Sequence, residues 1–280
     1  MRLRDPVFVI GFQRGGTNIL TNLIGSHPAM RMLGRETHQV FYGKARESLS
    51  KWKRRLLYLP VFLGARGHLF RATHLEDRNR VPRSLLPYVD WLLFREAGHP
   101  EPPVRVLCKN VNGMAFVTPV FREMYPGAIF FALVRNGLAL CEGHVRRGRR
   151  AEDFARLYNR VCGRMLRDAD EMTGYCIVKF EDMIEDPLAV AGKAFRDAGL
   201  DDSQVTRYRL QAKQSMDAQG KRSYTFGGER DRETRWFEPA DLPGCFRKDV
   251  NANQIARLAP RDREIFLQIA GGTMERLGYV

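Results

Sequence analysis

One stretch of the chain has the residue types of an anion-binding loop. Residues 11–18 read GFQRGGTN in one-letter code and follow a short apolar segment. Gly15 and Gly16 allow a tight turn that points successive backbone N–H groups into one concavity. The helix predicted to follow adds its positive end, and Thr17 and Asn18 can donate a hydroxyl and an amide from its first turn. The sequence therefore predicts a loop that binds a phosphate group.

The same loop lacks two parts of a nucleoside-triphosphate loop. The pattern GxxxxGK[ST] would place a lysine where Thr17 stands and a serine or threonine where Asn18 stands. Arg14 is the only cation of residues 11–18, and it precedes the usual position of the lysine. We therefore expect a phosphate dianion bound without magnesium. The alternative is an ordinary strand-to-helix turn, because a single glycine-rich turn is a weak signal.

A second group of cations follows another apolar segment. Residues 132–139 read ALVRNGLA, so Arg135 stands at the end of a predicted strand and a helix begins at once. In a parallel sheet, Arg135 would lie on the same edge as the glycine loop, where α/β folds bind ligands. On the helix, Gly143 and Arg147 are four residues apart and share one face. Arg135 and Arg147 are therefore candidates to bind a second phosphate through charge-assisted hydrogen bonds.

The elements that must position these residues alternate along the chain. Apolar segments bounded by turn residues or charge predict strands at 7–11, 104–108, 129–134 and 175–180. Helices are predicted at 17–25, 113–125, 138–147, 151–173, 188–198, 202–216 and 252–277. This order is typical of an α/β fold with three layers, α/β/α, in which helices cover both faces of a central parallel sheet.

The length of 280 residues fits one domain, and we expect residues 1–280 to form a single unit. Two regions interrupt the alternation of strands and helices. Residues 43–103 are basic, contain several prolines and have a mostly helical pattern, so we expect an insertion that faces the substrate. Residues 217–250 contain several glycines and prolines and predict a long loop, which in a compact domain is usually functional or disordered.

The composition narrows the class of partner. Lys and Arg outnumber Asp and Glu by 46 to 32, and the resulting net charge of +14 attracts anionic ligands. The five cysteines have no CxxC or Cys/His spacing, so neither a disulfide framework nor a metal site is expected. The sequence shows no membrane span, signal peptide or nucleic-acid-binding motif. We expect a soluble, cytoplasmic protein.

Four motifs, in one order, resemble those of sulfotransferases that use 3′-phosphoadenosine 5′-phosphosulfate (PAPS). Residues 11–18 resemble the 5′-phosphosulfate loop GxPRSGTT, and residues 133–137, LVRNG, resemble the 3′-phosphate strand and helix. Residues 178–187 and 275–279 are similar to the downstream (Y/F)ED(L/M)xxDP turn and to the LGY ending. The resemblance implies a P-loop-like sulfotransferase fold, PAPS as the donor, adenosine 3′,5′-bisphosphate as a product, and no metal.

The resemblance also implies roles for single residues. The 5′-phosphosulfate would be bound by Arg14, Gly15, Gly16, Thr17 and Asn18, and the 3′-phosphate by Arg135 and Arg147. The loop at 217–250 would cover the donor, with Ser223 as a further phosphate contact. The sequence departs from the family pattern where Gln13 replaces a proline, Asn18 a second threonine, and Gly143 the serine that contacts the 3′-phosphate.

A general base is expected near the loop. The helix after the loop should end near residue 27, about 15 Å away, and roughly eight extended residues can bring the chain back. Residues 34–38, GRETH, resemble segments of tyrosylprotein and heparan sulfate sulfotransferases whose glutamate acts as the base. We therefore assign Glu36 as the base, with His38 as a competitor or as a hydrogen-bonding group beside it. Lys109, where the family has its KxP motif, is expected to neutralise charge on the sulfate or acceptor side.

Together these residues predict an enzyme that moves a sulfuryl group from PAPS to a hydroxyl of a saccharide, a peptide tyrosine or a small metabolite. Glu36 would take the proton while Arg14 and Lys109 balance the charge of the leaving phosphate. One alternative is a P-loop kinase for a nucleotide or small molecule, and another is a non-catalytic protein that binds acidic polymers. The absence of a membrane anchor in the sequence favours a bacterial enzyme over a Golgi enzyme.

Overall fold

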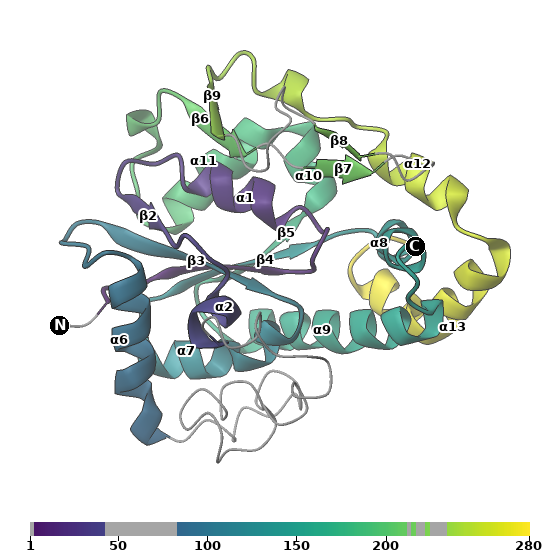
Figure 1. The fold of residues 1–280 in the computed structure, drawn as a ribbon, viewed down its shortest axis with the longest axis horizontal. Helices are drawn as coiled ribbons and strands as arrows, with labels where there is room; N and C mark the ends of the chain where they lie inside the picture. The colour runs from purple at the N-terminus through teal and green to yellow at the C-terminus, as the bar shows by residue number, and fades with distance from the viewer. Residues whose placement is uncertain (1–2, 43–82, 212–213, 217–221, 225–233) are drawn as a thin grey trace.

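The centre of the structure, a computed structural model, is a sheet of five parallel strands. The residues described are 3–42, 83–211, 214–216, 222–224 and 234–280. The strands are β1 (Val7–Gly11), β2 (Met30–Met32), β3 (Arg105–Val111), β4 (Ile129–Val134) and β5 (Tyr175–Lys179). Their order is β2-β3-β1-β4-β5, so the first strand of the chain lies in the middle of the sheet (Figure 1).

The side chains of β1 alternate between two apolar cores. Val7 and Val9 belong to the core on one face of the sheet, whereas Phe8 and Ile10 belong to the core on the other. Both faces are covered, and for this reason the strand is apolar along its whole length and completely buried. A continuous apolar run is thus a sign of a central parallel strand.

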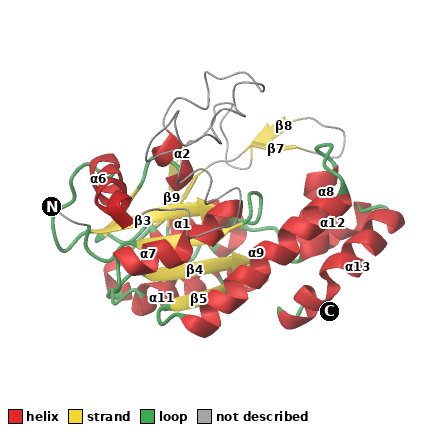
Figure 2. Ribbon diagram, turned by 90° about the horizontal axis from the view of Figure 1, so that it is seen from below, coloured by secondary structure: helices red, strands yellow, loops and turns green. Residues whose placement is uncertain are grey.

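Helices cover both faces of the sheet, as Figures 1 and 2 show from two directions. The core that contains Val7 also takes in α1 (Thr17–Ile24), α10 (Phe180–Glu185) and α11 (Pro187–Asp197). The core that contains Phe8 takes in α2 (Thr37–Tyr42), α6 (Leu86–Glu96), α7 (Thr118–Met124), α8 (Gly137–Val145), α9 (Ala151–Glu171) and α13 (Pro260–Arg276). The predicted three-layer α/β/α fold is confirmed.

The register of the sheet brings the ends of the central strands together. Gly11 at the end of β1 lies opposite Val111 of β3 and Leu133 of β4. The chain then enters α1 on one face of the sheet, whereas after β3 and β4 it enters helices on the other face. In open parallel sheets, ligands bind at the carboxyl ends of strands whose connections diverge in this way. The fold therefore places the glycine loop at such a point.

Most predicted elements exist, with shifted ends. The strands at 7–11 and 129–134 agree with the prediction, whereas β3 continues to Val111 and β5 ends at Lys179 because Phe180 already belongs to α10. The segment predicted as a helix at 113–125 begins as a 3₁₀ helix, η4 (Asn112–Val117), and continues as α7. The sequence pattern does not predict β2, which has three residues and exposes Arg31.

The predicted helix at 202–216 is wrong. After a 3₁₀ turn, η5 (Asp202–Gln204), the chain forms β6 (Tyr208–Gln211) and β7 (Gln214–Met216). Tyr208 and Leu210 are buried and alternate with residues that are less buried, which is the period of a strand and not of a helix. β6 pairs with β9 (Thr234–Phe237) and β7 with β8 (Arg222–Tyr224), both antiparallel.

The C-terminal helix predicted at 252–277 is two helices, and the long loop predicted at 217–250 contains short elements. α12 (Val250–Arg257) ends before Pro260, the first residue of α13, because proline lacks the N–H that an uninterrupted helix would need there. The segment 217–250 includes β8, β9 and a 3₁₀ helix, η6 (Pro243–Cys245).

Parts of both expected functional segments lie outside the described residues. Of the predicted insertion at 43–103, the structure describes a 3₁₀ helix, η3 (Arg83–Leu85), α6 and the residues that follow it to 103. Residues 43–82, 217–221 and 225–233 are not described. None of the helices in the described ranges has the length and apolar character needed to cross a membrane.

Candidate active site

The glycine loop turns sharply between β1 and α1. The Gly15 N–H donates to the Phe12 carbonyl at 3.0 Å, and both Arg14 (φ 71°) and Gly16 (φ 94°) have left-handed backbone conformations. A Cβ at position 16 would stand 2.5 Å from the Phe180 ring, so this position accepts glycine alone without rearrangement. The turn leaves the start of α1 directed at the carboxyl edge of the sheet.

The first turn of α1 offers unused backbone donors. Within the described residues, the N–H groups of Gly16, Thr17 and Asn18 have no acceptor, and no side chain caps the helix. These donors and the positive end of the helix dipole together form a site for an anion. The Arg14 side chain, exposed beside them, adds a full positive charge.

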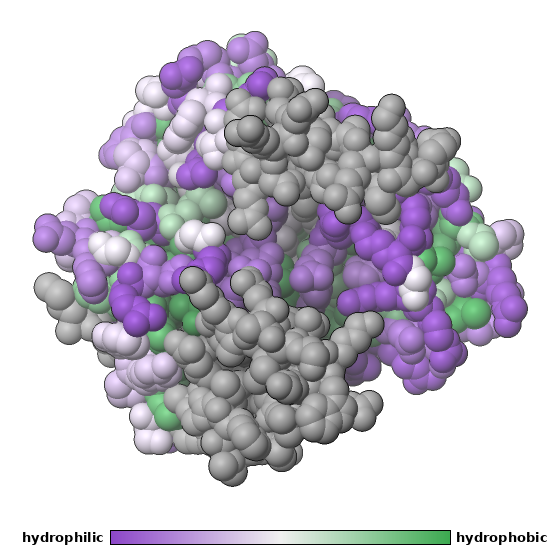
Figure 3. Space-filling view, viewed as in Figure 1, coloured by the Kyte–Doolittle hydropathy of each residue, from purple (hydrophilic) through white to green (hydrophobic). Residues whose placement is uncertain are grey.

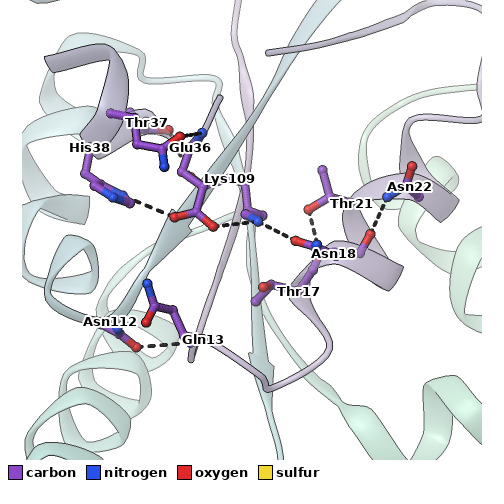
Figure 4. A network of polar contacts seen from close by, with 11 residues as sticks. Gln13, Thr17, Asn18, Thr21, Asn22, Glu36, Thr37, His38, Lys109 and Asn112 are labelled. Carbon is purple, nitrogen blue, oxygen red and sulfur yellow. Dashed lines mark hydrogen bonds and ion pairs between the residues drawn. The ribbon is translucent and has the colours of Figure 1, made fainter. Parts of the chain in front are cut away.

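Three side chains from separate elements meet in front of this loop (Figure 4). The Lys109 Nζ of β3 lies 2.7 Å from the Glu36 Oε1 and also donates to the Asn18 Oδ1. Only 16% of the Lys109 side chain and 21% of the Glu36 side chain are exposed, so the ion pair is partly shielded from water. The contacts form one line from Glu36 through Lys109 to the loop.

The residues around Glu36 fix its direction. Its backbone N–H donates to the Gln39 Oε1 at 3.2 Å, and the Thr37 hydroxyl donates to the Lys109 carbonyl at 3.2 Å. The Nδ1 of His38 lies 3.4 Å from the second carboxylate oxygen of Glu36, Oε2. The structure therefore brings Glu36, His38 and Lys109 together, although they come from segments about 70 residues apart.

The two departures of the loop from the family pattern both involve contacts with β3 or the residue after it. The Gln13 N–H donates to the Asn112 Oδ1 at 3.1 Å, a bond that a proline could not make because it has no N–H. The Asn18 amide oxygen accepts from Lys109. Asn112 and Thr37 are site residues that sequence patterns do not reveal, because they act through contacts between distant segments.

Arg135 emerges from the end of β4 and is almost completely buried, with 6% exposed. Its guanidinium donates to the carbonyl of Arg14 at 2.9 Å, to the Asn251 Oδ1 at 2.8 Å and to the Gln254 Oε1, and it stacks over the ring of Phe180. Burial lowers the pKa of Arg135 to about 10, so the group remains a cation at neutral pH. The predicted strand-end position is confirmed, and the bond to Arg14 ties it to the loop.

Arg147 lies just after the end of α8, four residues after Gly143, whose carbonyl accepts from its Nη1. Its pKa is lowered by partial burial and by the neighbouring cations Arg14 and Arg146. Arg14 is therefore close enough to Arg147 to disfavour its charge, and an anion bound between them would relieve that repulsion. Figure 3 shows hydrophilic residues gathered on the side of the molecule formed by α8 and α12.

Ser223 is the last of the predicted phosphate-binding residues. Ser223 belongs to β8 and lies opposite Ser215 of β7, but its side chain is outside the described residues, and its predicted contact with a phosphate stays a prediction.

Among the described residues there is no group of three or more His, Cys, Asp or Glu side chains able to hold a metal ion.

Solved structures share this fold at low sequence identity. The sulfotransferase domain of the Synechococcus PCC 7002 olefin synthase has a TM-score of 0.57 and 14% identity, with 100% of this chain and 97% of that chain covered. The sulfotransferase domain of the curacin biosynthetic pathway has a TM-score of 0.55 and 12% identity, with 100% and 99% covered. A sulfotransferase from Alicyclobacillus acidocaldarius gives 0.50 and 14%, with 98% and 94% covered.

The sequence comparison identifies the family. Residues 6–224 match the model of the sulfotransferase family, and this range includes the glycine loop, Glu36, Lys109, Arg135 and Arg147. No curated protein sequence matches the chain. The family match spans most of the chain and agrees with the fold of the solved structures, and the chain therefore belongs to the sulfotransferase family.

Proposed function

We propose that the protein transfers a sulfuryl group from PAPS to a hydroxyl group of an acceptor. The observation that carries this proposal is the line of contacts from Glu36 through Lys109 to Asn18, which joins a candidate base to a candidate donor loop. An enzyme for sulfuryl transfer needs a proton acceptor and cations for the leaving phosphate close to one another.

The donor groups of the loop suit a phosphosulfate better than a triphosphate with magnesium. Gly16, Thr17 and Asn18 offer three backbone N–H groups without an acceptor in the described part of the chain, and Arg14 offers a cation. The Asn18 side chain takes up the Lys109 ammonium, so β3 supplies the lysine that the loop itself lacks. These groups bind anionic oxygens without a metal ion.

PAPS, when bound, supplies a sulfuryl group activated by its bond to phosphate. Glu36 is positioned to accept the proton of the acceptor hydroxyl, and Lys109 to balance negative charge between the base and the loop. His38, on the other side of the Glu36 carboxylate, is a candidate to orient it or to contact the acceptor. Arg135 and Arg147, with the loop, would hold the 3′-phosphate of the donor. The proposed acceptor is a saccharide, a peptide tyrosine or a small metabolite.

The test combines donor binding with transfer. The protein is incubated with ³⁵S-labelled PAPS and a panel of oligosaccharides, tyrosine peptides and small alcohols and phenols, in the presence of EDTA. Replacement of the base, Glu36→Gln, should lower kcat by about 10²–10⁴-fold and leave the affinity for adenosine 3′,5′-bisphosphate within about threefold. His38→Gln should lower kcat less, because His38 is assigned a supporting role.

The outcomes separate the parts of the proposal. Full turnover by Glu36→Gln would overturn the assignment of the base, and full turnover by that variant together with a collapse in His38→Gln would assign the base to His38. Adenosine 3′,5′-bisphosphate should raise Tm without magnesium, by mass action. If ATP with magnesium raised Tm and the bisphosphate did not, PAPS would be wrong as the donor.

A further inference from the structure

A glutamine of α12 reaches into the seam between α12 and α8. The Gln254 Oε1 accepts a hydrogen bond from the Arg135 guanidinium, and its Nε2 donates to the Glu142 Oε2 at 3.0 Å. Glu142 is 4% exposed and also pairs with Arg146 and Arg257. The amide of Gln254 is therefore held in one orientation by a cation on one side and a carboxylate on the other.

Within the described residues, Gln254 and Arg135 each keep side-chain N–H groups that have no acceptor. A glutamine amide has two N–H groups, of which Glu142 takes one. A guanidinium has five N–H groups, and three on Arg135 have acceptors in the described residues: Asn251, the Arg14 carbonyl and Gln254. Its two terminal nitrogens, Nη1 and Nη2, thus each keep one N–H without an acceptor in the described residues, and Nη2 is the one bonded to Gln254.

Gly143, on α8, faces the seam between α12 and α8 next to Gln254. A Cβ built on Gly143 would meet the Gln254 Nε2 at 3.4 Å and the Arg147 Nη1 at 3.7 Å. The space that a longer side chain at position 143 would enter is therefore already bordered by an amide N–H donor and a guanidinium. The region is positive, because Arg14 lowers the pKa of Arg147, and Arg147 and Arg14 both lower the pKa of His144.

We propose that Gln254 is a binding residue for the 3′-phosphate of the donor, and that its amide supplies the hydrogen bond that a side chain at Gly143 cannot make. This inference rests on the proposed function, since it assumes a donor with a 3′-phosphate. In it, the phosphate binds across the seam, with the second amide N–H of Gln254 on one side and Arg135 and Arg147 on the other. α12 thus becomes part of the donor site, although it lies beyond the residues that the family model matches.

The test compares two ligands that differ in the 3′-phosphate alone. Isothermal titration gives Kd for adenosine 3′,5′-bisphosphate and for adenosine 5′-monophosphate, in EDTA and at one ionic strength. Gln254→Met keeps the size of the side chain but removes both polar atoms. It should reduce the preference for the bisphosphate by about tenfold or more, because a hydrogen bond to a charged group is lost, and should leave Kd for the monophosphate nearly unchanged.

The matched control is Gln268→Met, an exposed glutamine on α13 that bonds within its own helix. It should keep the wild-type preference. An unchanged preference in Gln254→Met would overturn the inference, and if that variant did not fold, Gln254→Glu would be read in the same way. A wild-type protein that binds both nucleotides equally would instead contradict the proposed donor, so the two failures are distinguishable.

Discussion

At the scale of single residues, the loop and β3 work as one unit. The loop has no lysine, but Lys109 of the neighbouring strand reaches Asn18, and Asn112 after the same strand accepts from the backbone of Gln13. Each of the two unusual loop residues thus has a partner next to the loop, and a proline at position 13 would lose the contact with Asn112 because it has no N–H. The departures of the loop are therefore coupled to its neighbour, β3.

Gly16 is the position at which the loop tolerates least change. Gly16→Ala would place a Cβ at φ 94° and 2.5 Å from the Phe180 ring. Urea unfolding should show a loss of about 2–4 kcal/mol in the free energy of unfolding, and titration should show weaker binding of adenosine 3′,5′-bisphosphate. Gly34→Ala is the control, because a Cβ there meets nothing within 4 Å. Equal stability of the two variants would contradict the loop geometry.

His144 makes the stability of the protein sensitive to acid. Burial and the cations Arg149, Arg147 and Arg14 lower its pKa from 6.5 to about 4. Above pH 6.5 the group is neutral in both states and contributes nothing, but as the pH falls from 6.5 towards 4 the unfolded chain alone takes up the proton, and stability is lost. His144→Phe, which keeps the stacking on Phe154, should reduce the stability lost between about pH 7 and pH 5 by about 2 kcal/mol.

The measurement is urea unfolding at several pH values for the wild type and His144→Phe. The comparison is between the two pH dependences, so that a change in packing that is independent of pH does not affect it. Parallel curves for the two proteins would show that His144 does not titrate in this range.

The sequence predicts site residues to very different degrees. The loop residues and Arg135 follow from strand ends and glycine spacing, and Glu36 follows from the reach of the chain together with the resemblance. Asn251 and Gln254 do not, because each contacts Arg135 from 116 or 119 residues further along the chain. No local pattern marks a polar residue whose partner is set by the packing of two helices.

At the scale of elements, three family motifs meet at one carboxylate. Glu181, in the first turn of α10, accepts from the Asn136 N–H at 3.0 Å, from the Asn251 side chain and from the Tyr279 hydroxyl at 2.7 Å. Asn136 follows Arg135, and Tyr279 is part of the LGY ending. The C-terminal motif therefore helps to fix the strand end that presents Arg135.

The link between the residues after α13 and the start of α10 can be tested by a double-mutant cycle. Tyr279→Phe removes the hydroxyl that donates to Glu181 and should lower the free energy of unfolding by about 2 kcal/mol, the value of a hydrogen bond to a charged group. In the background of Glu181→Gln the same change should cost less, since the charged acceptor is gone. Strictly additive effects in chemical unfolding would show that the two groups are not coupled.

The sequence predicts the completely buried central strands, but not the short strands of mixed polarity. The central strands are continuous apolar runs, which only a covered parallel sheet needs, so the fold class follows from the sequence. The short β2 and the strand pairs formed by β6, β7, β8 and β9 have few residues and mixed polarity, and their existence depends on a partner strand. The division of the last helix was visible in Pro260 alone.

At the scale of the whole molecule, several exposed arginines of this basic protein lie on the side that the donor would use. The net charge is +14, and the exposed arginines Arg14, Arg147, Arg149 and Arg257 lie on the loop, at the end of α8 and on α12. Carboxylates near this side include the buried Glu142, which pairs with Arg146 and Arg257. Such a field attracts a ligand with several negative charges from a distance beyond direct contact.

Salt should therefore weaken donor binding in proportion to ligand charge. An increase in NaCl from about 50 mM to about 500 mM shortens the Debye length to a few ångströms, so the outer arginines no longer act on the ligand. Kd for adenosine 3′,5′-bisphosphate should rise by about tenfold or more, whereas Kd for uncharged adenosine should change by less than about twofold. Reversal of a remote charge, Arg149→Glu, should flatten the salt dependence for the bisphosphate alone. If salt changed Kd for adenosine 3′,5′-bisphosphate and Kd for adenosine equally, the electrostatic field of the whole molecule would play no part in binding. Short-range contacts in the loop and in the α8–α12 seam would then account for binding.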